Sequence, residues 1–269
     1  MQEVKQYPAG TFSWIDLITS DPTAAKHFYG QLFGWEAHDM PTDQDGVYTM
    51  LTLHGKDVAG MTAMSPEQSA QNIPPYWMSS ISVDDVQATT ERARGLGATI
   101  LAPPFPVMEA GWMAVLQDPT GAAFSLWEPR QHIGARLVNQ PNTLCWNELT
   151  TRDTAAASAF YQSLFGWETQ TTPSPAGDYI SFTNQGRMAA GMLTLQAEWG
   201  EMPSAWGIYL AVEDCDATVQ QAQELGGKVM MPPTDLPEIG RMAVLQDPQG
   251  AVFSVIKMDV ADPPPGYTA

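Results

Sequence analysis

The residues best placed to do chemistry in this sequence are two carboxylates, each of which follows a tryptophan by two positions. The pattern W-x-[DE]-L occurs at Trp14 and Asp16, and again at Trp146 and Glu148. Side chains alternate between the faces of a strand, so each tryptophan shares a face with its carboxylate. A carboxylate on a buried face is costly unless it is hydrated or paired, and otherwise its pKa rises. Asp16 and Glu148 are therefore candidate catalytic groups, as general bases or as anchors for a cation.

The same two carboxylates also have a purely structural interpretation. Each could accept hydrogen bonds from backbone amides, or pair with an arginine in a contact between domains, and do no chemistry. The sequence leaves both alternatives open for Asp16 and Glu148, because it does not distinguish an inner cavity from an interface.

Further candidate ligand-binding residues are expected near these carboxylates. They combine indole, hydroxyl and thioether groups, and they are Trp14, Tyr48, Met78, Ser125, Trp146, Tyr179 and Ser254. Each type also has an ordinary structural role. Tyrosine and methionine fill the core of a sheet, and a serine without a histidine partner is a weak nucleophile that more often packs or forms hydrogen bonds.

A tandem repeat indicates which elements position these residues. The segment FYGQLFGWE begins at Phe28, and FYQSLFGWE begins at Phe160, 132 positions later. Longer segments match at offsets of 131 and 129, among them GWMAVLQDPTGAAFS and GRMAVLQDPQGAVFS. The matches predict two domains, at residues 9–129 and 141–259. Residues 130–140 are predicted to be the linker between them, and residues 260–269 a Pro-rich tail.

Each half in turn reads as two similar units of one strand, one helix and three strands. Asp21 fits a helix N-cap with a proline in the first turn, and Gly34 fits the end of that helix. Phe28, Tyr29 and Leu32 belong to a broad apolar stripe on this helix, which is typical of a helix lying on a sheet. The repeated nonapeptide is therefore predicted to be core, and the chain is predicted to be four βαβββ units.

The Asp-Pro helix start, the FY…LFGW helix and the closing LQDPxGAxFS segment resemble the vicinal oxygen chelate superfamily, which includes glyoxalase I, extradiol dioxygenases and bleomycin-resistance proteins. The chain most resembles its tandem, glyoxalase-like "hydroxylase" branch. This resemblance implies an α+β fold in which the four βαβββ units form two cupped, eight-stranded mixed sheets with helices on the outside. Each cup would enclose a cavity.

Enzymes of that superfamily bind a divalent metal through His, Gln or Glu on four inner strands. At the corresponding positions this sequence has Trp14 and Trp146, Gly60 and Gly191, Met78 and Gly207, and Ser125 and Ser254. None of these side chains is a usual ligand of Zn, Fe or Mn. The four histidines, His27, His38, His54 and His132, are expected at the surface. We therefore expect no metal site and no cofactor.

The composition of the chain limits the classes of binding partner and the cellular location that we expect. The formal net charge of −18 repels phosphate backbones and anionic lipids, which argues against nucleic acid and membrane partners. No apolar run is long enough to span a membrane, and the N-terminus lacks an apolar signal segment. Cys145 and Cys215 have neither metal-ligand nor disulfide-framework spacing, so a cytoplasmic location is expected. Each predicted domain contains both halves of its cup, so a monomer or a homodimer is expected.

These observations favour a protein that binds a small organic molecule in a cavity of each domain, without the family metal. It could be a metal-independent enzyme that uses Asp16 and Glu148 for proton transfer. The sequence leaves the enzyme assignment open, and the resemblance implies a lyase or an oxidoreductase. The alternatives are a resistance protein that sequesters a cationic aromatic compound, and a metal-dependent lyase or dioxygenase with relocated ligands.

Overall fold

The protein, represented by a computed structural model, is described for residues 3–42, 46–174, 177–196 and 200–259. The first sheet consists of β1 (Thr11–Thr19), β2 (Glu36–Pro41), β3 (Val47–Leu53), β4 (Lys56–Ala63), β5 (Tyr76–Ser82), β6 (Thr99–Val107), β7 (Gly111–Gln117) and β8 (Ala123–Pro129). The second consists of β9 (Leu144–Thr151), β10 (Glu168–Ser174), β11 (Gly177–Asn184), β12 (Arg187–Thr194), β13 (Ala205–Ala211), β14 (Lys228–Leu236), β15 (Gly240–Gln246) and β16 (Val252–Met258). The helices are α1 (Pro22–Phe33), α2 (Pro66–Ala70), α3 (Val86–Gly95), α4 (Thr154–Phe165) and α5 (Cys215–Glu224).

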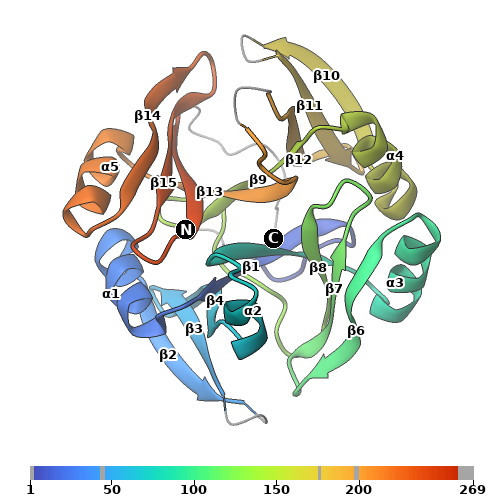
Figure 1. The fold of residues 1–269 in the computed structure, drawn as a ribbon, viewed down its shortest axis with the longest axis horizontal. Helices are drawn as coiled ribbons and strands as arrows, with labels where there is room; N and C mark the ends of the chain where they lie inside the picture. Colours follow the sequence, from blue (N-terminus) through green and yellow to red (C-terminus); the bar gives the residue numbers. More distant parts are fainter. Residues whose placement is uncertain (1–2, 43–45, 175–176, 197–199, 260–269) are drawn as a thin grey trace.

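The two sheets have the same topology. Their strand orders are β2-β3-β4-β1-β5-β8-β7-β6 and β10-β11-β12-β9-β13-β16-β15-β14. At the centre of the first sheet, β1 runs parallel to β4 and antiparallel to β5, and β5 runs parallel to β8. This arrangement confirms the predicted α+β class with four βαβββ units in two mixed sheets. Figure 1 places α1, α3, α4 and α5 at the periphery. Among the described residues, no helix is long and apolar enough to cross a membrane.

Local signals in the sequence account for the ends of the helices. The side chain of Asp21 accepts a hydrogen bond from the Ala24 amide at the start of α1, and a proline occupies its first turn. The helix ends at Gly34, whose φ of 69° is left-handed and favours glycine. At α4, Asp153 is again the N-cap, and Gly166 again ends the helix in the left-handed conformation. The repeat therefore fixes α1 and α4 at equivalent places in the two halves.

Two hydrophobic cores hold the molecule together, and each is built from both halves. The predicted apolar stripe on α1 is buried against β16, near the C-terminal end of the chain. The ring centroids of Phe28 and Phe253 are 6.3 Å apart. In the other core the Phe124 and Phe160 rings are 6.2 Å apart. Figure 1 shows the corresponding pairing, with α1 beside α5 and α3 beside α4. The boundaries 9–129 and 141–259 stay predictions, because the two halves share their cores.

A buried hydrogen-bond chain crosses each of these two contacts between the halves. The Tyr29 hydroxyl donates to the Asp247 carboxylate over 3.0 Å and accepts from the Trp77 indole over 3.2 Å. In the other core the Tyr161 hydroxyl donates to Asp118 over 2.9 Å. The tyrosine of the repeated nonapeptide therefore binds the aspartate of the repeated LQDPxG segment of the opposite half. Both repeated motifs serve the junction between the halves.

Candidate functional site

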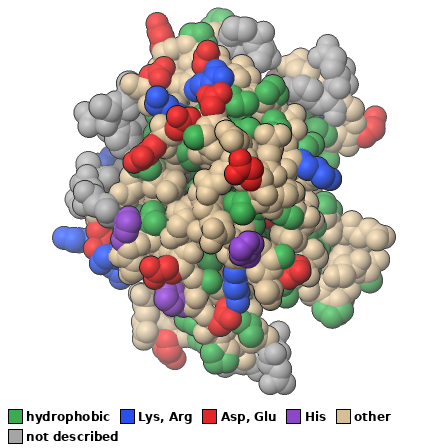
Figure 2. Space-filling view, turned by 90° about the vertical axis from the view of Figure 1, so that its left-hand side faces the viewer, with side chains coloured by type: hydrophobic (Ala, Val, Ile, Leu, Met, Phe, Trp, Pro, Cys, Tyr) green, Lys and Arg blue, Asp and Glu red, His purple; other side chains and the backbone are tan. Residues whose placement is uncertain are grey.

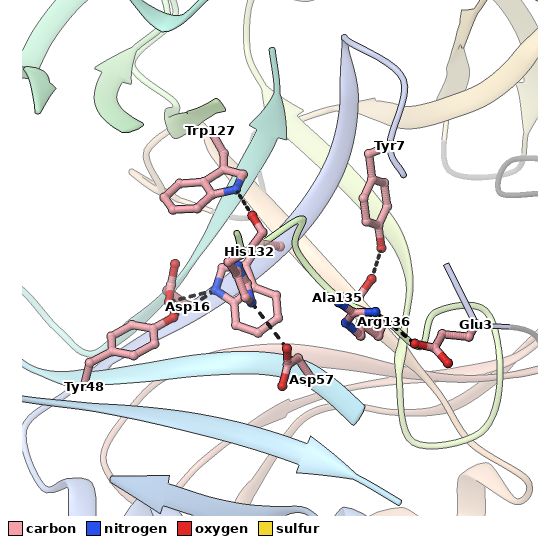
Figure 3. A network of polar contacts seen from close by, with 10 residues as sticks. Glu3, Tyr7, Asp16, Tyr48, Asp57, Trp127, His132, Ala135 and Arg136 are labelled. Atoms are coloured by element: carbon pink, nitrogen blue, oxygen red, sulfur yellow. Dashed lines mark hydrogen bonds and ion pairs between the residues drawn. The ribbon is translucent and has the colours of Figure 1, made fainter. Parts of the chain in front are cut away.

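The first candidate site is built on β1 and β3, on the face of the first sheet opposite the helices. The Tyr48 hydroxyl donates to Asp16 Oδ1 over 2.6 Å, and Trp14 Nε1 lies 3.1 Å from the same oxygen. Trp14 Nε1 also lies 3.0 Å from the Tyr48 hydroxyl. Figure 3 shows Tyr48 directed at Asp16. We call the face that bears such a carboxylate the cup face. In the first sheet the alternate residues Ile15 and Leu17 point to the other face, because side chains alternate along a strand, and both are fully buried in the core.

A glycine on the neighbouring strand makes room for this cluster. Gly60 is paired with Asp16 in the β1–β4 register. A Cβ built on Gly60 would lie only 1.8 Å from the Tyr48 hydroxyl and 2.3 Å from Asp16 Oδ1. The tyrosine hydroxyl therefore occupies the space that any side chain at position 60 would fill.

Burial raises the pKa values of the two titratable groups in this cluster. Loss of solvation raises the pKa of Asp16 from 3.8 to about 6, although hydrogen bonds from Tyr48 and Trp14 oppose the shift. The pKa of Tyr48 is raised well above its usual range, first by burial and then by the nearby Asp16 charge. A carboxyl group that titrates near neutral pH is suited to accept and return a proton.

The raised pKa of Asp16 predicts a specific dependence of stability on pH. Between about pH 4 and 6 the folded protein retains a proton on Asp16 that the unfolded chain has released. Stability should therefore fall as pH rises through this window. Relative to Asp16→Asn, the wild-type free energy of unfolding should decrease by up to about 3 kcal/mol. Urea denaturation of both proteins at several pH values measures the difference, and a difference independent of pH would contradict it.

The second candidate site repeats the plan on β9 and β11 but adds a residue. The Tyr209 hydroxyl, on β13, donates to Glu148 Oε1 over 2.7 Å. Trp146 Nε1 donates to the Tyr179 hydroxyl over 3.0 Å. Burial raises the pKa of Glu148, while hydrogen bonds from Tyr209 and Tyr179 oppose the rise. A Cβ on Gly191 would lie 1.9 Å from the Tyr179 hydroxyl, as at Gly60.

Tyr209 is a site residue that the sequence analysis missed. The repeat aligns it with Ser80 at the offset of 129, so the two halves differ at this position. The signal that could have found it is strand alternation, because Gly207 had been placed on the cup face two residues earlier.

The remaining predicted residues lie on the central strands of the two sheets. Ser125 is fully buried, with its hydroxyl 2.6 Å from that of Ser80. Met78, 7% exposed, is paired with Asp16 in the β1–β5 register. Ser254 is paired with Tyr209 and is 8% exposed. Among the described residues, the two carboxylates accept hydrogen bonds from tyrosine and tryptophan side chains, with no arginine or backbone amide among their partners.

The prediction that all four histidines lie at the surface is wrong for His132. His27, His38 and His54 are exposed, and Figure 2 shows histidine side chains on one face of the molecule. The His132 side chain is only 17% exposed, and its ring lies edge-on to that of Trp14 at 4.6 Å. His132 Nε2 is 3.7 Å from Asp57, and burial lowers its pKa. The linker folds back onto the first cup face, as Figure 3 shows, which accounts for its burial.

The residues at the family's ligand positions do not fit a metal. Trp14, Gly60, Met78 and Ser125 and their matches offer no imidazole or carboxylate, and the Cβ clash at Gly60 shows that its place is taken by a tyrosine. Over the described ranges, no three His, Cys, Asp or Glu side chains gather as a set that could hold a metal ion. Asp16 and Glu148 are each surrounded by aromatic hydroxyl and indole groups instead of further ligands.

Comparison with known families agrees with the fold and with the repeat. The model of the Glyoxalase/Bleomycin resistance protein/Dioxygenase superfamily matches residues 11–126 and again 140–255. The chain belongs to this superfamily and carries its domain twice.

Named relatives and a solved structure are similar to the chain over most of its length. A Mycobacterium tuberculosis protein named "Putative glyoxylase CFP32" is 42% identical over 96% of this chain and 98% of its own. The "Anthracycline biosynthesis protein DnrV" of Streptomyces peucetius is 34% identical over 94% and 95%. The Mn(II)-bound glyoxalase from Novosphingobium aromaticivorans has the same fold, with a TM-score of 0.65 at 11% identity, covering 97% of this chain and 86% of its own.

Proposed function

We propose that this chain binds a small organic molecule on its cup faces and acts on it, or holds it, without the family metal. The observation that carries the proposal is the carboxylate cluster, which both halves build beside the glycine at a family ligand position. Asp16 and Glu148 are its acid–base groups, and tyrosine hydroxyls are their partners.

The geometry of the first cluster leaves capacity for a ligand. Both described hydrogen bonds to Asp16 end on Oδ1, so Oδ2 can accept a donor from a bound molecule. Tyr48 holds the carboxylate in place and stabilises its charged form. A proton taken by Asp16 returns readily, because its pKa of about 6 is close to neutral pH.

The names of the relatives support a small-molecule role but differ about its chemistry. One is named as a glyoxylase and another as an anthracycline biosynthesis protein. A second candidate function is sequestration of a cationic aromatic compound. The carboxylate beside Trp14 and the net charge of −18 favour it. The two functions differ in turnover and share the binding site.

The test replaces Asp16 with Asn and Glu148 with Gln in one protein. Compounds found by a thermal-shift screen of small organic molecules are then titrated, with tryptophan fluorescence as the readout. Loss of a charge-assisted contact worth about 1.5–3 kcal/mol should weaken binding roughly tenfold to a hundredfold. If the chain is an enzyme, turnover should fall as well.

The matched control is Asp21→Asn with Asp153→Asn, which alters two carboxylates at helix N-caps away from the cup faces. Its affinity should equal that of the wild type. If Asp16→Asn with Glu148→Gln lowers stability but leaves affinity unchanged, the carboxylates are structural. Elemental analysis that finds about one Zn, Fe, Mn or Ni per half, lost on chelation together with binding, would overturn the metal-free mechanism.

A further inference from the structure

The two cup faces can be compared row by row, because strand pairing fixes which residues lie side by side. In the first half one row runs Val115, Ser125, Ser80 and Trp14 across β7, β8, β5 and β1. In the second half the same row runs Val244, Ser254, Tyr209 and Trp146. The rows differ at a single position, where the second half has Tyr209 and the first has Ser80.

The next row differs in the space beside the carboxylate. Asp16 lies between Gly60 and Met78, and the Met78 side chain is buried at 7% exposure. Glu148 lies between Gly191 and Gly207, and Gly207 is exposed. Among the described residues, the atom nearest to a Cβ on Gly207 would be the Glu148 carbonyl oxygen, at 3.7 Å. The second cup therefore keeps open the volume that Met78 fills in the first.

The linker adds to the closure of the first cup. The Trp127 indole donates to the His132 carbonyl over 2.9 Å, and the His132 ring packs on Trp14. The Ala135 amide then donates to the Ser13 carbonyl over 2.8 Å. As a result Trp14 and Trp127 are only 5% and 7% exposed, whereas Trp146 on the second cup is partly exposed.

The second cup face also carries an apolar cluster that is separate from the two shared cores. Its buried members are Cys145, Ala211, Met242 and Ile256, and the partly exposed residues packed on them include Trp146, Tyr209, Met231 and Val244. At two of the matching positions the first half has polar residues, Ser13 and Ser82. The second cup thus presents a partly exposed apolar surface on the same face as the Glu148 carboxylate.

We propose that the second cup is the ligand site of this chain, and that it takes a flat aromatic molecule that is uncharged or cationic and donates a hydrogen bond to Glu148. This inference rests on the proposed function and assigns it to one half. The bare backbone at Gly207 lets a ring lie against the strand, as glycine in a strand often permits. The apolar cluster buries the ring, and the Glu148 carboxylate selects a donor group and rejects an anion.

The test uses three naphthalene probes of equal ring size with the full chain at neutral pH. They are 1-naphthol, 1-naphthylmethylammonium and 1-naphthalenesulfonate, and isothermal titration calorimetry measures their binding. We expect the naphthol and the ammonium compound to bind, and the sulfonate to bind at least tenfold more weakly. Equal binding of the sulfonate, or no binding of any probe, overturns the ligand class.

Matched variants assign the site to one half. Gly207→Met supplies the side chain that the first cup has at the matching position. Val244→Trp adds bulk in the row of Tyr209, on the far side of Ser254. Each variant should weaken probe binding at least tenfold. Val115→Trp places the same bulk at the matching position of the first cup and should change affinity less than twofold. Circular dichroism checks that each variant folds. If Val244→Trp does not fold, Gly207→Met still decides the test, because it lies at an exposed position with free space.

The outcomes separate this inference from the proposed function. If Val115→Trp abolishes probe binding and Gly207→Met does not, the first cup is the site, and the inference fails while the proposed function stands. If Glu148→Gln and Asp16→Asn both leave the binding of every ligand unchanged, the proposed function itself fails.

Discussion

Replacing Asp118 and Asp247 together with alanine should lower the free energy of unfolding by about 6 kcal/mol. Asp247 Oδ1 accepts hydrogen bonds from the Gln249, Gly250 and Ala251 amides over 2.7–2.9 Å, and Oδ2 accepts the Tyr29 hydroxyl. Alanine leaves these donors unpaired, at a cost of about 3 kcal/mol for each site. The two sites lie in different cores, so their effects should add.

A loss of this size approaches the whole stability of a typical domain, which is about 5–15 kcal/mol. Urea unfolding followed by fluorescence measures it for each single variant and for the double variant. The control is Asp21→Ala, which removes an exposed helix N-cap and should cost only about 1 kcal/mol. Equal costs for Asp247→Ala and Asp21→Ala would show that the buried hydrogen bonds of Asp247 contribute no more than an exposed helix cap.

The second large effect is expected at the glycines on either side of Glu148. Gly191→Ala places a methyl group 1.9 Å from the Tyr179 hydroxyl, so the tyrosine must leave its hydrogen bonds with Trp146 and Glu148. Overpacking and the lost bonds together should cost about 3–5 kcal/mol. Thermal and urea unfolding measure the stability, and a change in the tryptophan emission would report the lost bond between Trp146 and Tyr179.

Gly207→Ala is the matched control, because it adds the same methyl group on the opposite side of the same carboxylate. Its nearest neighbour, the Glu148 carbonyl oxygen, is 3.7 Å away, so its cost should be below about 1 kcal/mol. The contrast isolates the occupied space at Gly191. Similar stability for the two alanine variants would mean that Tyr179 does not lie over Gly191 in solution.

Much of the fold could be predicted from the sequence because its signals are local and occur twice. The Asp21 cap, the Gly34 end and the repeated strands predict four units, and the structure has them. Helix α2 was not predicted, although Ser65 and Gln68 form a capping box there. The joining of the two halves in each core was not predicted either, because an apolar stripe shows that a helix is buried but not which element covers it.

Only one aspect of the site was predictable from the sequence, namely which residues share a face of the same strand. Trp14 and Asp16 could be placed on one face from their spacing, and Tyr48 could be noticed because the repeat keeps it at Tyr179. The hydrogen bonds between them depend on register across strands, which the sequence does not specify. His132 was misplaced because a linker has no periodicity from which burial can be inferred.

The sharing of cores between the ends of the chain has a consequence for synthesis on the ribosome. Tyr29 and its partner Asp247 are 218 residues apart. At a synthesis rate of about 5–20 residues per second, α1 leaves the ribosome roughly 10–40 s before the segment that covers it. During that time the aromatic stripe of α1 lacks the part of its core that the second half of the chain contributes. Folding of the first half to its final state must therefore wait for nearly the last strand of the second.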